Sequence, residues 1–156
     1  MFDNMNFKLR GELRYRISIG GFINANKVEI PDFQHFNGNR VYSNKKYLNS
    51  FQLASYYRYS NTRQFYSVVH VEHHFNGLLT NKIPLFNKLK WYLVAGTNTF
   101  YVNRDNYYTE IFAGLENIFK FLRVDFINAY EPGVRYQFGV RVGAGGLIGG
   151  KVRFDD

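Results

Sequence analysis

The stretch Phe7-Lys8-Leu9-Arg10-Gly11-Glu12-Leu13-Arg14-Tyr15-Arg16-Ile17-Ser18-Ile19 alternates between two kinds of residue. Its odd positions are Phe, Leu, Gly, Leu, Tyr, Ile and Ile, and its even positions are Lys, Arg, Glu, Arg, Arg and Ser. Because a β-strand points successive side chains to opposite faces, one face of this strand is apolar and the other carries five charges. At about 3.3 Å per residue, the stretch is longer than the roughly 9–11 residues that a tilted transmembrane strand needs.

A strand in lipid must have both of its edges paired, because the hydrocarbon offers no hydrogen-bonding partner to the backbone. Such a strand therefore belongs to a closed barrel. We expect an all-β fold, an antiparallel up-and-down transmembrane β-barrel segment.

The composition agrees with this expectation. The chain has 156 residues, the size of a single domain, and 19% of them are aromatic, with 13 Tyr, 16 Phe and one Trp. Outer-membrane barrels concentrate aromatic rings in girdles at both lipid–water boundaries. The mean hydropathy is −0.34, and no run approaches the roughly 18 apolar residues of a helical span. A barrel strand hides its hydrophobicity in alternation, so this polar average is compatible with a membrane location.

Charge and cysteine content exclude some classes of partner and of functional site. The formal net charge of +8 indicates either a solvated basic surface or contact with anionic lipid. We expect no nucleic-acid partner, because the positive charges sit on alternate strand positions rather than in a basic helix or an aromatic platform. The absence of cysteine excludes disulfides, zinc–thiolate sites and cysteine nucleophiles.

The N-terminal residues Met1–Met5 show no basic start followed by an apolar block, as a signal peptide would. Since an outer-membrane protein needs such a signal, either the signal was removed or the chain is the tail of a longer protein. We expect the second, with residues 1–156 as one β-barrel segment, and the resemblance given below implies that this segment is the C-terminal part of a larger barrel.

The sequence predicts about six long strands, separated by turn formers and by one long connection. Residues 25–62 form this connection, which is too long for an ordinary turn and contains a strand-like stretch at Ser50–Ser60. The amphipathic piece Leu85–Lys90 predicts one helical turn. The expected strands lie at about 6–24, 64–75, 91–102, 107–118, 121–130 and 135–148.

The strand faces opposite the apolar ones collect charges of both signs. Isolated charges inside a barrel are costly, but paired charges in a watered lumen need not be. The alternative is a soluble barrel with these faces in water, and it requires an interior built only from the apolar faces. We predict a lumenal polar network that comprises Arg10, Glu12, Arg14, Arg58, Glu72, Glu110, Glu116, Arg123, Asp125 and Arg141.

The run His70-Val71-Glu72-His73-His74 contains the ligand types that zinc, iron or copper prefers. On a strand, however, His70 and His74 lie about 13 Å apart, which is too far for one ion without ligands from neighbouring strands. We expect no metal and no cofactor. Ser67 near His70 is a weak candidate for a nucleophile and its base, and the G-x-S-x-G, H-E-x-x-H and P-loop motifs are absent. We therefore expect no enzymatic activity.

Several runs resemble the C-terminal barrel of a poorly characterised outer-membrane family of Bacteroidetes-type bacteria. They are Glu72–Gly77 with Asn81–Leu85, Gly114–Lys120, Leu122–Phe126 and His35–Asn39. Full-length members of that family carry an N-terminal carboxypeptidase-regulatory-like domain of β-sandwich type. The resemblance implies a location in the outer membrane of a Gram-negative bacterium. It also implies contact with outer-membrane lipid and with the rest of a larger barrel or other envelope proteins.

That family is in turn similar to the BamA/TamA-like surface-antigen barrels, which assemble or translocate outer-membrane proteins. The order here, one strand, a long loop and five further strands, resembles their last six strands. The resemblance implies that residues 25–62 form a plug-like loop folded into the lumen. The arginine–glycine–aromatic motif of that loop is absent here; Tyr57-Arg58-Tyr59 is the nearest counterpart, with Glu72 or Asp125 as possible partners.

Three functions are therefore open. The first is a non-enzymatic outer-membrane barrel with a role in outer-membrane assembly, transport or anchoring. The second is a small stand-alone porin-like barrel, which requires a further strand from residues 50–60. The third is a soluble lipocalin-like barrel that binds an apolar ligand.

Overall fold

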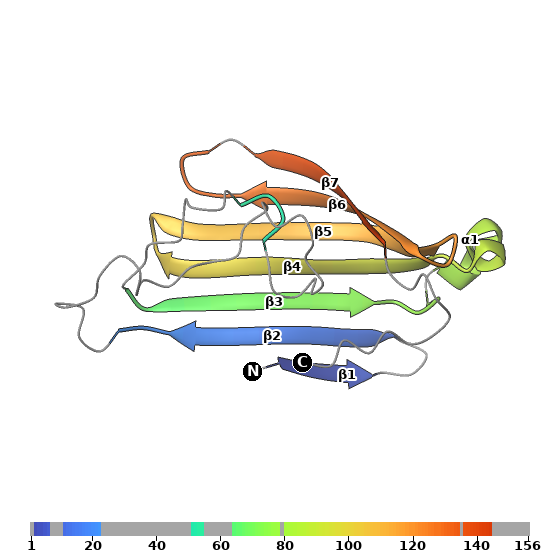
Figure 1. The fold of residues 1–156 in the computed structure, drawn as a ribbon, viewed down its shortest axis with the longest axis horizontal. Helices are drawn as coiled ribbons and strands as arrows, with labels where there is room; N and C mark the ends of the chain where they lie inside the picture. Colours follow the sequence, from blue (N-terminus) through green and yellow to red (C-terminus); the bar gives the residue numbers. More distant parts are fainter. Residues whose placement is uncertain are drawn as a thin grey trace.

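A computed structural model describes residues 2–6, 11–22, 51–54, 64–78, 80–134 and 136–144 (Figure 1). These residues form one seven-stranded antiparallel sheet in which each strand pairs with the next along the chain. The all-β, antiparallel up-and-down fold expected from the sequence is confirmed. Within the described residues, no ladder joins the edge strands at the two ends of this order.

The strands are long in the middle of the sheet and shorter at its edges. A 3₁₀ turn, Thr80–Lys82, and the helix α1, Pro84–Leu89, connect the third strand to the fourth. Among the described residues, no helix has the length and hydropathy that a helical membrane span requires. The strands are β1 (Phe2–Asn6), β2 (Glu12–Gly20), β3 (Tyr66–His74), β4 (Tyr92–Asn103), β5 (Asn106–Ile118), β6 (Leu122–Tyr130) and β7 (Gln137–Ala144).

The prediction of one strand over residues 6–24 is wrong. Residues Phe2–Asn6 form a separate strand that pairs antiparallel with the first half of β2, with Phe2 opposite Arg16 and Asn6 opposite Glu12. Gly11, which directly precedes β2, has a φ of +105°, a backbone conformation that residues other than glycine rarely adopt. A Cβ atom at Gly11 would also collide with the carbonyl oxygen of His74. The alternation therefore predicted the faces of β2 correctly but missed the break before it.

The other five strands and the helical turn lie close to their predicted positions. Pro84 begins α1, where its missing N–H group is not needed, and Lys90 ends the helix in the left-handed conformation. The side chain of Asn103 accepts hydrogen bonds from the backbone N–H groups of Asp105 and Asn106, which fixes the tight turn between β4 and β5.

The predicted strand-like stretch at residues 50–60 is wrong for its described part, because residues 52–54 form a bend and Phe51 lies in no strand. The rest of the long connection, including Tyr57-Arg58-Tyr59, lies outside the described residues. Lys8 and Arg10 lie outside them as well.

The two faces of the sheet differ in character. The covered face, against which residues 51–54 pack, presents the even-numbered residues of β2–β5 and the odd-numbered residues of β6 and β7. The outer face presents the intervening residues and carries no Asp, Glu, Lys or Arg in β2–β7. The charged residues of these strands all lie on the covered face: Glu12, Arg14, Arg16, Glu72, Glu110, Glu116, Arg123, Asp125 and Arg141.

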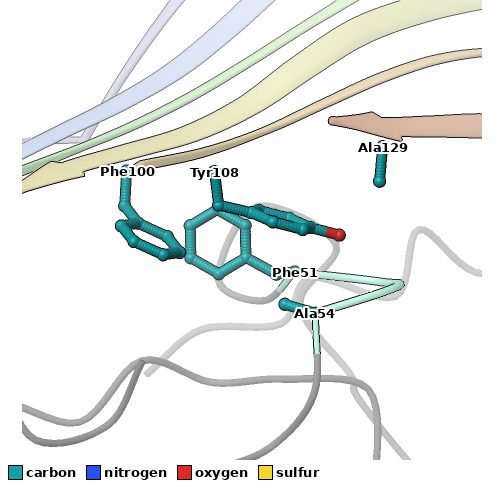
Figure 2. Packing of buried hydrophobic residues seen from close by; sticks show 5 residues of the cluster. All are labelled: Phe51, Ala54, Phe100, Tyr108 and Ala129. Atoms are coloured by element: carbon teal, nitrogen blue, oxygen red, sulfur yellow. The ribbon is translucent and has the colours of Figure 1, made fainter. Parts of the chain in front are cut away.

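The apolar core lies between the covered face and residues 51–54 (Figure 2). Phe51 is buried and meets the rings of Phe100 and Tyr108 edge to face, with centroids 5.2 and 5.6 Å apart. Leu53 packs against this cluster and against a second one around Phe112. The 51–54 segment therefore closes one region of the sheet with aliphatic and aromatic contacts.

Candidate functional site

The candidate site consists of two polar groups on the covered face. The first surrounds Glu110, whose side chain is fully buried in the middle of β5. Its Oε1 atom accepts hydrogen bonds from the backbone N–H groups of Gln52 and Leu53, both at 2.6 Å, and from the hydroxyl of Tyr108 at 2.7 Å. Glu110 thus holds the 51–54 segment by its backbone, in a position that hydrophobic contacts alone would not specify.

The neighbouring strands extend this group. The amide of Asn98 donates to Oε2 of Glu110 at 3.2 Å, and its Oδ1 atom lies 2.9 Å from Nδ1 of His70. Register explains the row, because His70 on β3, Asn98 on β4 and Glu110 on β5 stand directly opposite one another. The ring of Phe51 packs 5.2 Å from the ring of His70. The polar row and the apolar cluster therefore share the same inserted segment.

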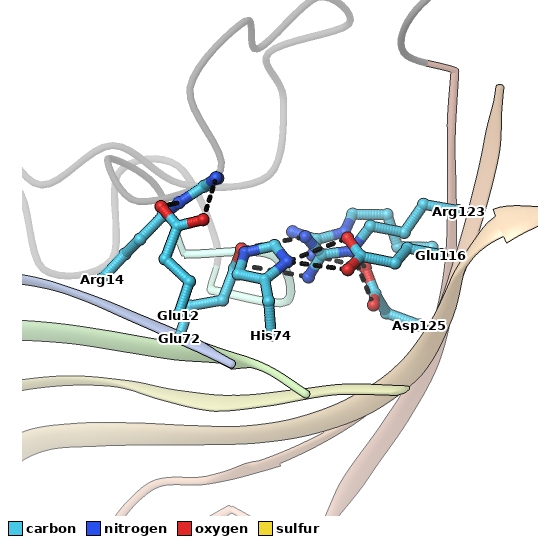
Figure 3. A network of polar contacts seen from close by, with 8 residues as sticks. Glu12, Arg14, Glu72, His74, Glu116, Arg123 and Asp125 are labelled. Carbon is cyan, nitrogen blue, oxygen red and sulfur yellow. Dashed lines mark hydrogen bonds and ion pairs between the residues drawn. The ribbon is translucent and has the colours of Figure 1, made fainter. Parts of the chain in front are cut away.

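The second group is an ion network (Figure 3). Arg123 on β6 forms a bidentate pair with Glu72 on β3, at 3.0 and 3.2 Å, and its Nε atom lies 2.9 Å from both carboxylate oxygens of Asp125. Arg141 on β7 donates to Oδ2 of Asp125 at 2.6 and 3.0 Å. Two carboxylates and two guanidinium groups therefore balance in charge, as buried ions must.

His74 extends the ion network, and a separate ion pair lies on the next strand. The ring of His74 lies between Glu72 and Glu116, with its Nδ1 atom 2.9 Å from the Glu116 carboxylate. Glu12 and Arg14, on the adjacent strand β2, pair with each other at 2.8 Å. In Figure 3 the Glu12–Arg14 pair lies beside the group formed by Glu72, His74, Glu116, Arg123 and Asp125.

Glycines make this arrangement possible. Glu72 and Arg123 lie on strands that are separated by β4 and β5, so their side chains must cross two backbones. Gly96 stands directly opposite Glu72, and Gly114 directly opposite Asp125. A Cβ at Gly114 would collide with the Asp125 carboxylate. These glycines remove the side chains that would otherwise stand beside the two carboxylates.

A family model matches residues 1–115, and its description is "Family of unknown function (DUF5686) C-terminal domain". The chain belongs to this family. No curated protein and no solved structure matches the chain. Membership in the DUF5686 C-terminal domain family fits the expected resemblance to an uncharacterised family, and it assigns no activity to the two polar groups.

The structure brings together part of the predicted polar network. Glu72, Arg123, Asp125 and Arg141 meet directly, and Glu116 joins them through His74. Glu12 and Arg14 pair with each other, and Glu110 belongs to the separate group that holds residues 51–54. Arg10 and Arg58 lie outside the described residues.

Asn98, Tyr108 and the backbone of residues 52–53 were not predicted to belong to the network. A signal for Asn98 existed, since an amide at an even position of a strand that otherwise buries apolar residues indicates a polar partner across the sheet.

In the described part of the chain, the residues considered for a metal site and for a nucleophile with its base do not come together. His70 and His74 belong to different polar groups, and the described residues contain no cluster of three or more His, Asp or Glu that is arranged to hold a metal ion. Ser67 lies on the outer face, opposite Ile19 and Tyr101, whereas His70 lies on the covered face. The weak nucleophile–base candidate therefore has its two members on opposite sides of the sheet.

Proposed function

We propose that this member of the DUF5686 C-terminal domain family is the C-terminal barrel segment of a non-enzymatic outer-membrane protein of a Gram-negative bacterium. Its role is outer-membrane assembly, transport or anchoring, and its partners are outer-membrane lipid and the rest of a larger barrel. One observation carries the proposal: every Asp, Glu, Lys and Arg of β2–β7 lies on the covered face, and the outer face is free of them. A water-soluble sheet has the opposite arrangement.

The exposure of the outer face supports the proposal. Ile111 is 62% exposed, Phe138 61% and Val142 66%, although each belongs to a regular strand. Water-soluble monomers rarely expose continuous apolar surface of this extent, whereas a lipid-facing barrel wall requires it.

Strand length and aromatic positions support it as well. β5 has 13 residues, and at about 3.4 Å per residue with a tilt of about 45° it spans about 30 Å, the thickness of a bilayer's hydrocarbon core. Tyr101, Tyr107 and Tyr130 cluster on the outer face at one end of the sheet, and Phe119 lies exposed at the other. Exposed aromatic residues at both ends of the strands fit the aromatic girdles that mark the two boundaries of a membrane barrel.

The covered face fits a lumen. Its ion network joins charges of both signs across several strands, and these charges balance. An interior filled with lipid would not tolerate such charges, whereas a polar lumen does. Residues 51–54 occupy the position that a plug-like segment of the long connection would take. A lipocalin-like soluble barrel needs the reverse, an apolar interior, so the burial of Glu72, Glu110 and Asp125 argues against it.

The test is extraction and gel mobility. The full chain, expressed with an outer-membrane signal, should enter the membrane fraction, require detergent for extraction and migrate faster before boiling than after it. Refolding into phosphatidylcholine vesicles should give the same heat-modifiable band. A monodisperse protein that stays in solution without detergent contradicts the proposal.

A further inference from the structure

One end of the sheet combines exposed apolar side chains with exposed lysines. This surface, the helical end, comprises the described residues 75–78 and 80–91, which lie between β3 and β4 and include α1, and residues 117–122, which include the turn between β5 and β6 (Figure 1). Its exposed apolar residues are Leu78, Ile83, Leu85, Leu89 and Phe119. Its lysines are Lys82, Lys88, Lys90 and Lys120, and all four are exposed.

The helix presents this surface rather than packing it away. None of the residues of α1 is buried. Leu85 and Leu89, four positions apart, share one side of the helix, and Lys88 borders them. Phe86, the next residue after Leu85, packs on Trp91, with the ring centroids 5.9 Å apart. Phe86 therefore contacts the residue that follows the helix, whereas Leu85 and Leu89 are exposed.

A hydrogen bond fastens the two connections to each other. The side chain of Asn117 donates to the backbone carbonyl of Lys90 at 2.7 Å. This bond ties the C-terminal end of α1 to the turn that carries Phe119 and Lys120. The lysines and the apolar side chains of the two connections consequently belong to one surface.

The charge of the helical end is one-sided. Residues 75–91 and 117–122 contain no Asp and no Glu. At the opposite end of the sheet, the described turns carry both signs, with Arg104 beside Asp105 and with Glu131 in the connection from β6 to β7. A partner of the helical end must therefore offer negative charge together with an apolar region.

We propose that the helical end lies in the headgroup region of one leaflet and binds anionic phospholipid. Leu85, Leu89 and Phe119 enter the boundary of the acyl chains, and the lysines reach the phosphate groups with their aliphatic stems along the apolar surface. An anionic phospholipid supplies both features that the surface calls for. Free phosphate supplies only the charge and leaves the apolar residues in water. This inference rests on the proposed membrane location.

Trp91 provides the assay, because it is the only tryptophan of the chain and packs on α1. The full chain is refolded into phosphatidylcholine vesicles that contain either brominated phosphatidylglycerol or the same fraction of brominated phosphatidylcholine. Brominated acyl chains quench tryptophan that lies close to them. We expect stronger quenching by brominated phosphatidylglycerol, corresponding to at least about a fivefold preference for the anionic lipid at low salt.

Variants separate the parts of the inference. Replacing Lys82, Lys88, Lys90 and Lys120 together by glutamine should remove the preference, whereas Arg104→Gln, at the opposite end, should keep it. Leu85→Ser with Leu89→Ser should weaken quenching by both lipids. Equal quenching by the two lipids in an inserted, heat-modifiable protein overturns this inference alone. Failure of the wild-type chain to insert overturns the proposed membrane location and the inference with it.

Discussion

The contact between Glu110 and the 51–54 segment gives the sharpest quantitative prediction. Glu110→Gln keeps an oxygen that accepts hydrogen bonds from Gln52 and Leu53 but removes the charge. A hydrogen bond to a charged group contributes about 1.5–3 kcal/mol and a neutral one about 0.5–1.5 kcal/mol. The bond from Tyr108 lies within β5, so only the two bonds from Gln52 and Leu53 hold the segment, and each weakens by about 1 kcal/mol. The seating of the segment should therefore lose about 2 kcal/mol.

Hydrogen exchange of the two amides measures this loss locally. Protection of the Gln52 and Leu53 N–H groups should fall roughly 30-fold, since 1.4 kcal/mol corresponds to a factor of ten. Glu116→Gln is the matched control, because Glu116 lies on the same strand and face but contacts His74 instead. Unchanged protection in Glu110→Gln, or an equal fall in Glu116→Gln, would refute the assignment of Glu110 as the residue that seats the segment.

Two further predictions concern the covered face. Glu72→Gln removes one of the two carboxylates that pair with Arg123 and should lower the free energy of unfolding, measured with urea in detergent micelles, by about 3–5 kcal/mol. The double variant with Arg123→Gln should lose clearly less than the sum of the two single changes. Strict additivity would contradict the pairing. Gly139→Ala brings a Cβ against the flexible end of Leu53 and should cost about 1 kcal/mol in the wild type but almost nothing further in a Leu53→Ala background. Gly96→Ala meets the backbone oxygen of Val71 and should cost about 2–3 kcal/mol in both backgrounds. Equal costs at the two glycines, measured by the same unfolding assay, would count against the packing described.

The sequence predicted the strands and their faces because alternation is a local property. Val69 and Glu72 were assigned to opposite faces, and the structure places them so. The exception was Gly11: at an odd position it fitted the apolar face, yet its backbone conformation and its approach to His74 end the strand. Such a break depends on a neighbouring strand, so the pattern of one strand does not reveal it.

The partners of each residue within the polar network could not be predicted from the sequence, for a different reason. Alternation places Glu72 and Arg123 on one face, but the partner of each depends on the register of four consecutive strands and on the glycines between them. The partners of Glu110 are backbone N–H groups of a segment whose composition gives no sign of where it docks. Conversely, the charge-free outer face follows directly from the sequence once the strand boundaries are known.

The most direct measurement compares two neighbouring substitutions on β2. Ile17 lies on the outer face, 41% exposed, and Ser18 lies on the covered face. The unfolding free energy of Ile17→Arg and Ser18→Arg is measured in vesicles. If the outer face contacts lipid, Ile17→Arg should cost about 2–4 kcal/mol and Ser18→Arg clearly less, because an arginine at mid-bilayer depth is destabilising. Changes within about 0.5 kcal/mol at both positions, as for a surface in water, would contradict a lipid-facing wall.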